Sequence, residues 1–166
     1  MDPKRQMLRH FLATLAYRTQ KALRDAPEAF AAFRVAPRVR TPHEIVKHMT
    51  SVLGYARTFF IGGEWRPEML EHFHDEVIRF HDMLESLNRH LEEGSPFRDM
   101  TPERMLQGPF SDAMSHVGQL AMLRRLFGAP IPPENFIMAA IEIQNVGPHQ
   151  PEPVSPDKEW HEPGKE

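Results

Sequence analysis

The sequence predicts an all-α protein, a four-helix bundle that ends in an extended, proline-rich tail. Apolar residues recur every three to four positions over four long stretches, which is the period of an amphipathic helix. Signals of helix ends separate these stretches, and no segment has the alternation typical of several strands. At 166 residues the chain is long enough to bury a substantial core. We expect one bundle domain over residues 1–146 and the tail over residues 147–166.

The first helix is expected to run from about Pro3 to Arg24. Its apolar stripe consists of Leu8, Phe11, Leu12, Leu15, Thr19 and Leu23. The basic side chains fall outside this stripe, which indicates a side that faces solvent. Residues 25–40 then form a connection, with one short helical turn at 28–33.

The second helix has the best-marked start in the chain. Thr41 is typical of an N-cap, Pro42 of the first helical position, and Glu44 completes a capping box. The apolar face of this helix contains Ile45, His48, Met49, Val52, Ala56, Phe59 and Phe60. The pair Gly62-Gly63 is expected to end it.

A third helix is expected from Pro67 to about Glu92, with Met69, Leu70, Phe73, Val77, Phe80, Leu84 and Leu87 facing inward. A short helical segment at 101–103 precedes the fourth helix, which begins at Gly108-Pro109 and is closed by Gly128. Because the turn after the second helix is short, helices two and three are expected to be antiparallel neighbours. Loop lengths leave open whether helices two and four run parallel.

The region after the fourth helix has a different composition. The apolar stretch 136–143 is expected to add either a final helix or an extended cover over the bundle. Beyond Gly147 the chain is rich in proline and charge, so it cannot be helical throughout. We expect this tail to be disordered or wrapped in extended form.

Charge and composition exclude several classes of function. The formal net charge is −3, so no overall field attracts nucleic acid or acidic membranes. No apolar run approaches the roughly 20 residues that span a bilayer, and the first residues lack the pattern of a signal peptide. Cysteine is absent, so any sulfur chemistry must take its thiol from a separate molecule. We expect a cytoplasmic protein without nucleic-acid or membrane partners.

Three residues are candidate metal ligands. Asp112 and His116 stand four positions apart, which places both on one face of a helix. His48 lies on the apolar face of the second helix, and bundle cores build metal sites from facing helices. Imidazole suits zinc, nickel, iron and copper, and the lack of thiolate ligands argues against a purely structural zinc site. The alternatives are a polar core network, or an acid that stabilises a helix N-terminus at Asp112 with two incidental histidines.

The residues around these candidates carry a family resemblance. The run Asp112–Arg125 resembles the last core helix of the DinB/YfiT-like superfamily, whose members usually carry two histidines four residues apart, then Gly-Gln and a Leu-Arg step. The run Glu44–Met49 is similar to the helix that supplies the family's first ligand. The resemblance covers about residues 5–128 and implies a four-helix bundle, often a homodimer, with a divalent metal on three side chains.

Carried over by position, the ligands implied by this resemblance are His48, Asp112 and His116. Asp112 stands where most members have histidine, although the mycothiol-dependent maleylpyruvate isomerase branch has glutamate there. We expect zinc first, with nickel or iron as alternatives. The characterised branches imply transfer of a low-molecular-weight thiol, such as bacillithiol or mycothiol, to a small-molecule electrophile, or a thiol-dependent isomerisation.

The basic residues before the second helix are candidates for cofactor binding. Arg38 and Arg40, with Arg34 and Lys47 close by in sequence, can receive the carboxylates of a thiol cofactor. A solvated basic loop is the alternative interpretation. For the whole protein, the two alternatives to an enzyme are a bundle that binds metal or ligand without catalysis and a structural dimerisation module.

Overall fold

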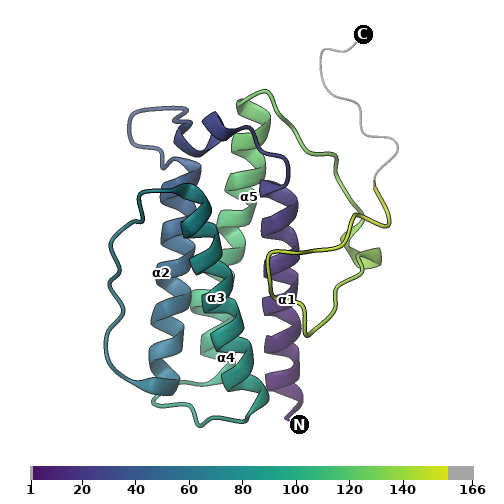
Figure 1. Cartoon of the computed structure of the whole chain (residues 1–166). Helices are drawn as coiled ribbons and strands as arrows, with labels where there is room; N and C mark the ends of the chain where they lie inside the picture. The colour runs from purple at the N-terminus through teal and green to yellow at the C-terminus, as the bar shows by residue number, and fades with distance from the viewer. Residues whose placement is uncertain (1, 157–166) are drawn as a thin grey trace.

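The computed structural model describes residues 2–156 and confirms an all-α fold (Figure 1). The described residues contain four long helices and no strand beyond an isolated bridge between Glu134 and Pro156. The long helices are α1 (Pro3–Leu23), α2 (Pro42–Ile61), α3 (Phe73–Glu92) and α5 (Ser111–Leu126), and the short α4 is Pro102–Met105. A 3₁₀ turn at Glu28–Ala32 lies in the first connection, as predicted. Within this described part of the chain, none of the helices is long and apolar enough to cross a membrane.

The start of α2 forms through the predicted local interactions. The Thr41 hydroxyl accepts a hydrogen bond from the Glu44 amide at 3.2 Å, and the Glu44 carboxylate accepts one from the Thr41 amide at 2.7 Å. Both halves of the capping box are therefore present, with Pro42 at the first helical position. Gly62 ends the helix with a φ of 77°, a left-handed conformation that favours glycine. These contacts set the position of His48, two turns into the helix.

The third helix begins six residues later than predicted, at Phe73 instead of Pro67. Residues 62–72 run in extended form along the side of the bundle (Figure 1). The buried carboxylate of Glu76 accepts a hydrogen bond from the Leu70 amide, and Arg79 pairs with it. Arg79 also donates to the Glu68 carbonyl at 2.9 Å. Tertiary hydrogen bonds therefore hold this segment outside the helix, and Met69 is exposed instead of inward-facing.

Residues 62–72 form a crossing segment between α2 and α3, and Trp65 anchors this segment to α2. A Cβ placed on Gly54 would lie 2.1 Å from the Trp65 indole, so only glycine lets the ring approach the helix backbone this closely. The guanidinium of Arg57 lies 4.9 Å from the centre of the same ring. This packing stabilises the extended path from the end of α2 back toward its start.

The crossing segment makes α2 and α3 parallel, so the predicted antiparallel pairing was wrong. His43 near the start of α2 contacts Phe73 at the start of α3, and Phe60 near the end of α2 stacks on His90 near the end of α3. Arg124 near the end of α5 donates to the carbonyls of Ala22 and Arg24 at the end of α1. Helices α1 and α5 are thus also parallel, and α2 runs antiparallel to α5 (Figure 1).

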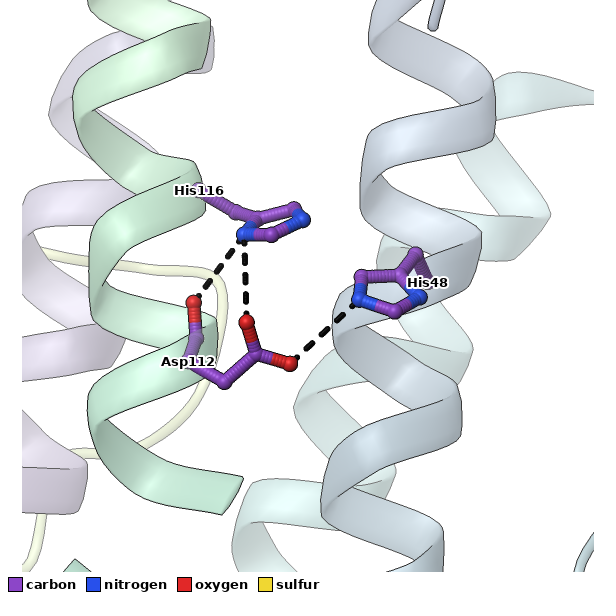
Figure 2. A group of neighbouring side chains, drawn as sticks. All are labelled: His48, Asp112 and His116. Atoms are coloured by element: carbon purple, nitrogen blue, oxygen red, sulfur yellow. Dashed lines mark hydrogen bonds and ion pairs between the residues drawn. The ribbon is translucent and has the colours of Figure 1, made fainter. Parts of the chain in front are cut away.

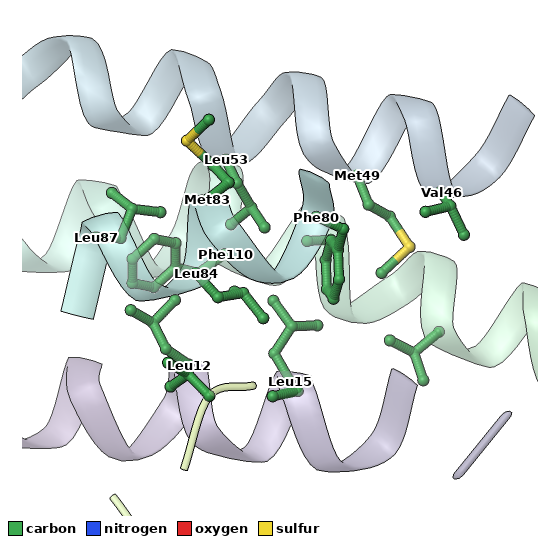
Figure 3. Close-up of a cluster of buried hydrophobic side chains, with 14 of the residues drawn as sticks. Leu12, Leu15, Val46, Met49, Leu53, Phe80, Met83, Leu84, Leu87 and Phe110 are labelled. Carbon is green, nitrogen blue, oxygen red and sulfur yellow. The ribbon is translucent and has the colours of Figure 1, made fainter. Parts of the chain in front are cut away.

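The four long helices enclose one apolar core, shown in part in Figure 3. Each helix contributes several fully buried side chains, and full burial of one Leu, Met or Phe stabilises the fold by about 1.5–3 kcal/mol. The central members labelled in the figure are Leu12, Leu15, Val46, Met49, Leu53, Phe80, Met83, Leu84, Leu87 and Phe110. The core keeps α2 and α5 in contact, and these two helices carry the candidate ligands.

Helix α5 begins at Ser111, close to the predicted Gly108-Pro109. A single wide turn, Leu106–Phe110, joins α4 to α5, and Gly108 in it has a non-helical φ of −92° and ψ of −105°. Phe110 is fully buried and stacks on Phe11 with 6.2 Å between ring centres. This buried ring fixes the first turn of α5, where Asp112 lies.

The C-terminal region forms the extended cover and not the final helix. Only Phe136–Met138 makes a 3₁₀ turn, and the following residues lie along α1 (Figure 1). The ring of His81 contacts the Val146 carbonyl at 2.8 Å, and Arg24 donates to the Gln150 carbonyl at 2.8 Å. The tail is thus extended as far as Pro156. The rest of the predicted tail, residues 157–166, lies outside the described residues.

Candidate metal centre

The three predicted ligands meet between α2 and α5 (Figure 2). His48 projects from the second turn of α2, while Asp112 and His116 lie one turn apart on α5. One ligand atom of each residue lies within 4.8 Å of the others. Within residues 2–156, no other group of histidine and acidic side chains converges in this way, including those of α3.

The Asp112 carboxylate lies beside the two imidazoles and faces one nitrogen of each (Figure 2). Its Oδ2 is 3.4 Å from Nε2 of His48, and its Oδ1 is 3.7 Å from Nδ1 of His116. The two rings lie nearly face to face, with 4.6 Å between their centres and an angle of 29°. The short aspartate side chain therefore reaches both histidines, one on each helix.

The hydrogen bonds of His116 define its tautomer. Nδ1 lies 3.0 Å from the Asp112 carbonyl, which only accepts, so Nδ1 carries the proton. Nε2 lies 3.1 Å from a guanidinium nitrogen of Arg40, which only donates, so Nε2 offers its lone pair to Arg40. The hydroxyl of Ser115 lies 3.3 Å from Nδ1 and also donates to the Asp112 carbonyl. Both nitrogens of His116 are thus engaged.

The cluster is buried on one side and open on the other. The side chain of His116 is only 8% exposed, whereas those of His48 and Asp112 are 29% and 42% exposed. The imidazole of His116 therefore forms the floor, and the other two groups form a rim that solvent reaches. A cation held by all three side chains would keep an open side for water or a small molecule.

The environment of His48 favours its neutral form. Burial lowers the pKa of His48 below its ordinary value of 6.5, and the nearby Arg40 and His116 lower it further. Asp112 acts in the opposite direction, with a smaller effect on this pKa. A neutral imidazole has the free lone pair that a metal ligand needs, so His48 is ready to bind a cation at neutral pH.

A pocket of about 340 Å³ adjoins His48. It is lined by Arg34, Arg38, Val39, Arg40, Glu44, Lys47, His48 and Met69. The two residues predicted to bind a cofactor, Arg38 and Arg40, thus share one pocket with a candidate ligand. Asp112 and His116 lie outside its lining, and the lining residues that contact His116 are Arg40 and His48.

The contact between Arg40 and His116 was not predicted. The two residues lie 76 positions apart, and no local pattern marks an arginine in a loop as the partner of a histidine on a distant helix. The sequence placed Arg40 only among basic residues near the start of the second helix.

The donor set fits a divalent cation of the zinc, nickel or iron type. It combines two imidazoles with one carboxylate and contains no sulfur, and its open side leaves room for further ligands. No protein-family model, curated protein sequence or solved structure matches this chain.

Proposed function

We propose that this protein is a divalent-metal-binding bundle of the DinB/YfiT-like type, with His48, Asp112 and His116 as the ligands. The observation that carries the proposal is the convergence of one ligand atom from each of these three side chains within 4.8 Å, where α2 packs on α5. Zinc is the first candidate because it takes imidazole and carboxylate ligands in open sites. Nickel and iron are alternatives with similar ligand preferences.

The open side of the site supports a catalytic use. A bound divalent cation would supply Lewis acidity, which lowers the pKa of a coordinated water or thiol. Since the chain has no cysteine, a thiol would come from a separate small molecule. We therefore propose a metal-dependent thiol transferase or isomerase, with a bacillithiol- or mycothiol-like thiol. Arg38 and Arg40 would hold the thiol's carboxylates, because both line the pocket beside His48.

The resemblance to the DinB/YfiT-like superfamily also supports a homodimer, which the mass of the protein in solution tests. We further propose a cytoplasmic location, with which the absence of cysteine is compatible.

A structural role is the second candidate, and a specific observation favours it. The Asp112 carboxylate already faces both histidines, and Arg40 already donates to Nε2 of His116. The three side chains thus have partners within the protein. The cluster can therefore serve as a polar network that holds α2 and α5 together, which we call the polar lock.

Metal content separates the two candidates. The native protein is measured by plasma mass spectrometry beside His48→Ala, Asp112→Asn and His116→Ala, with His10→Ala as the control because His10 is exposed on α1. Near-stoichiometric metal that is lost in the three site variants and kept in the control supports the metal site. Protein that stays metal-free after incubation with zinc, nickel and iron, and that loses stability in the site variants, supports the polar lock.

A further inference from the structure

The pocket beside His48 carries an uncompensated positive charge. Among its arginines and its lysine, Arg34 alone pairs with a carboxylate of the described residues, that of Glu44 at 2.8 Å. Within residues 2–156, the side chains of Arg38 and Lys47 form no hydrogen bond or ion pair, and Arg40 contacts only the His116 ring. Three cations thus face one small pocket in a chain whose formal net charge is −3.

The local fold holds these cations together. The amides of Arg38 and Val39 both donate to the Ala36 carbonyl, which forms a tight turn. The Arg34 guanidinium bonds to the Val39 carbonyl and to Glu44, which ties this turn to the first turn of α2. The capping box at Thr41 then fixes the direction in which α2 leaves the turn, and so the position of Lys47 relative to Arg38.

Arg34, Arg38 and Arg40 are exposed, and what distinguishes them from scattered surface charges is that they line one pocket together with Lys47. Like charges that line one pocket repel each other; water and salt screen part of this repulsion, and a bound anion relieves more of it. The pocket also has apolar walls from Val39 and Met69, and its volume of about 340 Å³ is at the small end of ligand sites. Its chemistry matches a small molecule that carries one strongly hydrated anionic group.

We propose that the pocket binds a small molecule through a carboxylate or phosphate group, with Arg38 and Lys47 as the charge contacts. A guanidinium offers two parallel donors to such an oxyanion, and a lysine adds a point charge. His48, on the same lining, would face the rest of the bound molecule. The inference rests on the proposed function and deepens it, because it states the charge of the substrate or thiol. The groups that would bind the anion are side chains of the protein, so anion binding does not require the metal ion.

Anion binding is therefore tested on the full chain without metal. Chelator-treated protein is titrated calorimetrically at low ionic strength with inorganic phosphate and, separately, with succinate as a carboxylate probe. We expect saturable binding of at least one probe, and the stronger one identifies the group. Arg38→Gln and Lys47→Gln should each weaken binding about tenfold, as expected for the loss of one charge-assisted hydrogen bond.

Arg125→Gln is the matched control, because Arg125 is exposed on α5, has no side-chain partner among the described residues and lies outside the pocket. It removes the same charge and should leave binding unchanged. Circular dichroism shows that each variant is folded. The inference is overturned if neither probe binds saturably, or if Arg125→Gln weakens binding as much as the pocket variants.

The two proposals fail separately. A chain that binds the oxyanion but takes up no zinc, nickel or iron retains the pocket assignment and loses the metal site. A chain that takes up metal but binds neither probe retains the metal site and loses the pocket assignment.

Discussion

The guanidinium of Arg40 lies 3.1 Å from Nε2 of His116, the ring nitrogen whose lone pair a metal ion would use. The other nitrogen, Nδ1, donates to the Asp112 carbonyl at 3.0 Å. A cation bound to Nε2 would lie about 2.0–2.1 Å from it, in the position that the arginine donor now approaches. Metal binding through Nε2 therefore requires Arg40 to move away, and the basic pocket that it already lines is the adjacent space.

We predict that Arg40→Ala raises the affinity for zinc by about tenfold, because it removes a competing hydrogen bond to His116. The affinity is measured by competition with a chromophoric chelator. Arg38→Gln is the control, since it removes a charge from the same pocket without a contact to His116. An equal gain in both variants would show that charge alone matters, and no gain in Arg40→Ala would show that Arg40 does not compete.

Asp112 is expected to contribute its charge to the site. Asp112→Asn keeps the shape of the side chain but loses the negative charge between His48 and His116, so the affinity for zinc should fall by tenfold or more. Asp112→Glu keeps the carboxylate and should lose less. The same chelator competition measures both variants. Equal affinity of native protein and Asp112→Asn would exclude Asp112 as a charged ligand.

The buried His81 should make the free energy of unfolding fall in acid. Burial lowers the pKa of His81 to about 4 from an ordinary 6.5, while the Val146 carbonyl and Asp82 oppose this shift and His149 adds to it. Above pH 6.5 the ring is neutral in the folded and the unfolded chain, so it adds no pH dependence. Between pH 6.5 and 4 only the unfolded chain gains the proton, and the free energy of unfolding should fall by up to about 3 kcal/mol.

Urea unfolding at several pH values measures this effect, with His81→Gln as the comparison because it cannot titrate. We expect the native protein to lose more stability than the variant between pH 6.5 and 4.5. Parallel pH profiles of the two proteins would contradict the assignment of the effect to His81.

Gly54 and Gly118 form a matched pair for testing the crossing segment. Gly54→Ala places a methyl group 2.1 Å from the Trp65 indole, so the ring must move and the free energy of unfolding should fall by about 1–3 kcal/mol. Gly118→Ala meets no atom within 4 Å on an exposed side of α5, so it should stabilise the fold by about 0.5–1 kcal/mol.

Chemical denaturation measures both changes, and a red shift of tryptophan emission, in a background with Trp160→Phe, reports the displacement of Trp65. If Gly54→Ala leaves both the stability and the emission unchanged, the Trp65 contact does not hold the crossing segment.

Local signals in the sequence were sufficient to predict most of the helices. The capping box of Thr41 and Glu44 and the left-handed Gly62 act within a single turn, so the bounds of α2 agree with the prediction. The candidate site could also be predicted from the sequence, since a histidine on an apolar face and an Asp–His pair at helical spacing indicate inward polar groups. His48, Asp112 and His116 do meet in the structure, as the prediction required.

The direction of α3 and the environment of His116 depended on contacts between separate parts of the chain. Residues 67–72 have a suitable helix start at Pro67, yet Glu76 and the packing of Trp65 on Gly54 hold them in extended form. The helix signal acts over one turn and stabilises weakly, whereas a buried carboxylate must keep its hydrogen-bond partners. In the same way, the antiparallel packing of α2 on α5 brings Arg40 to His116. Two residues 76 positions apart come into contact only when the helices pack, so no local pattern could indicate this contact.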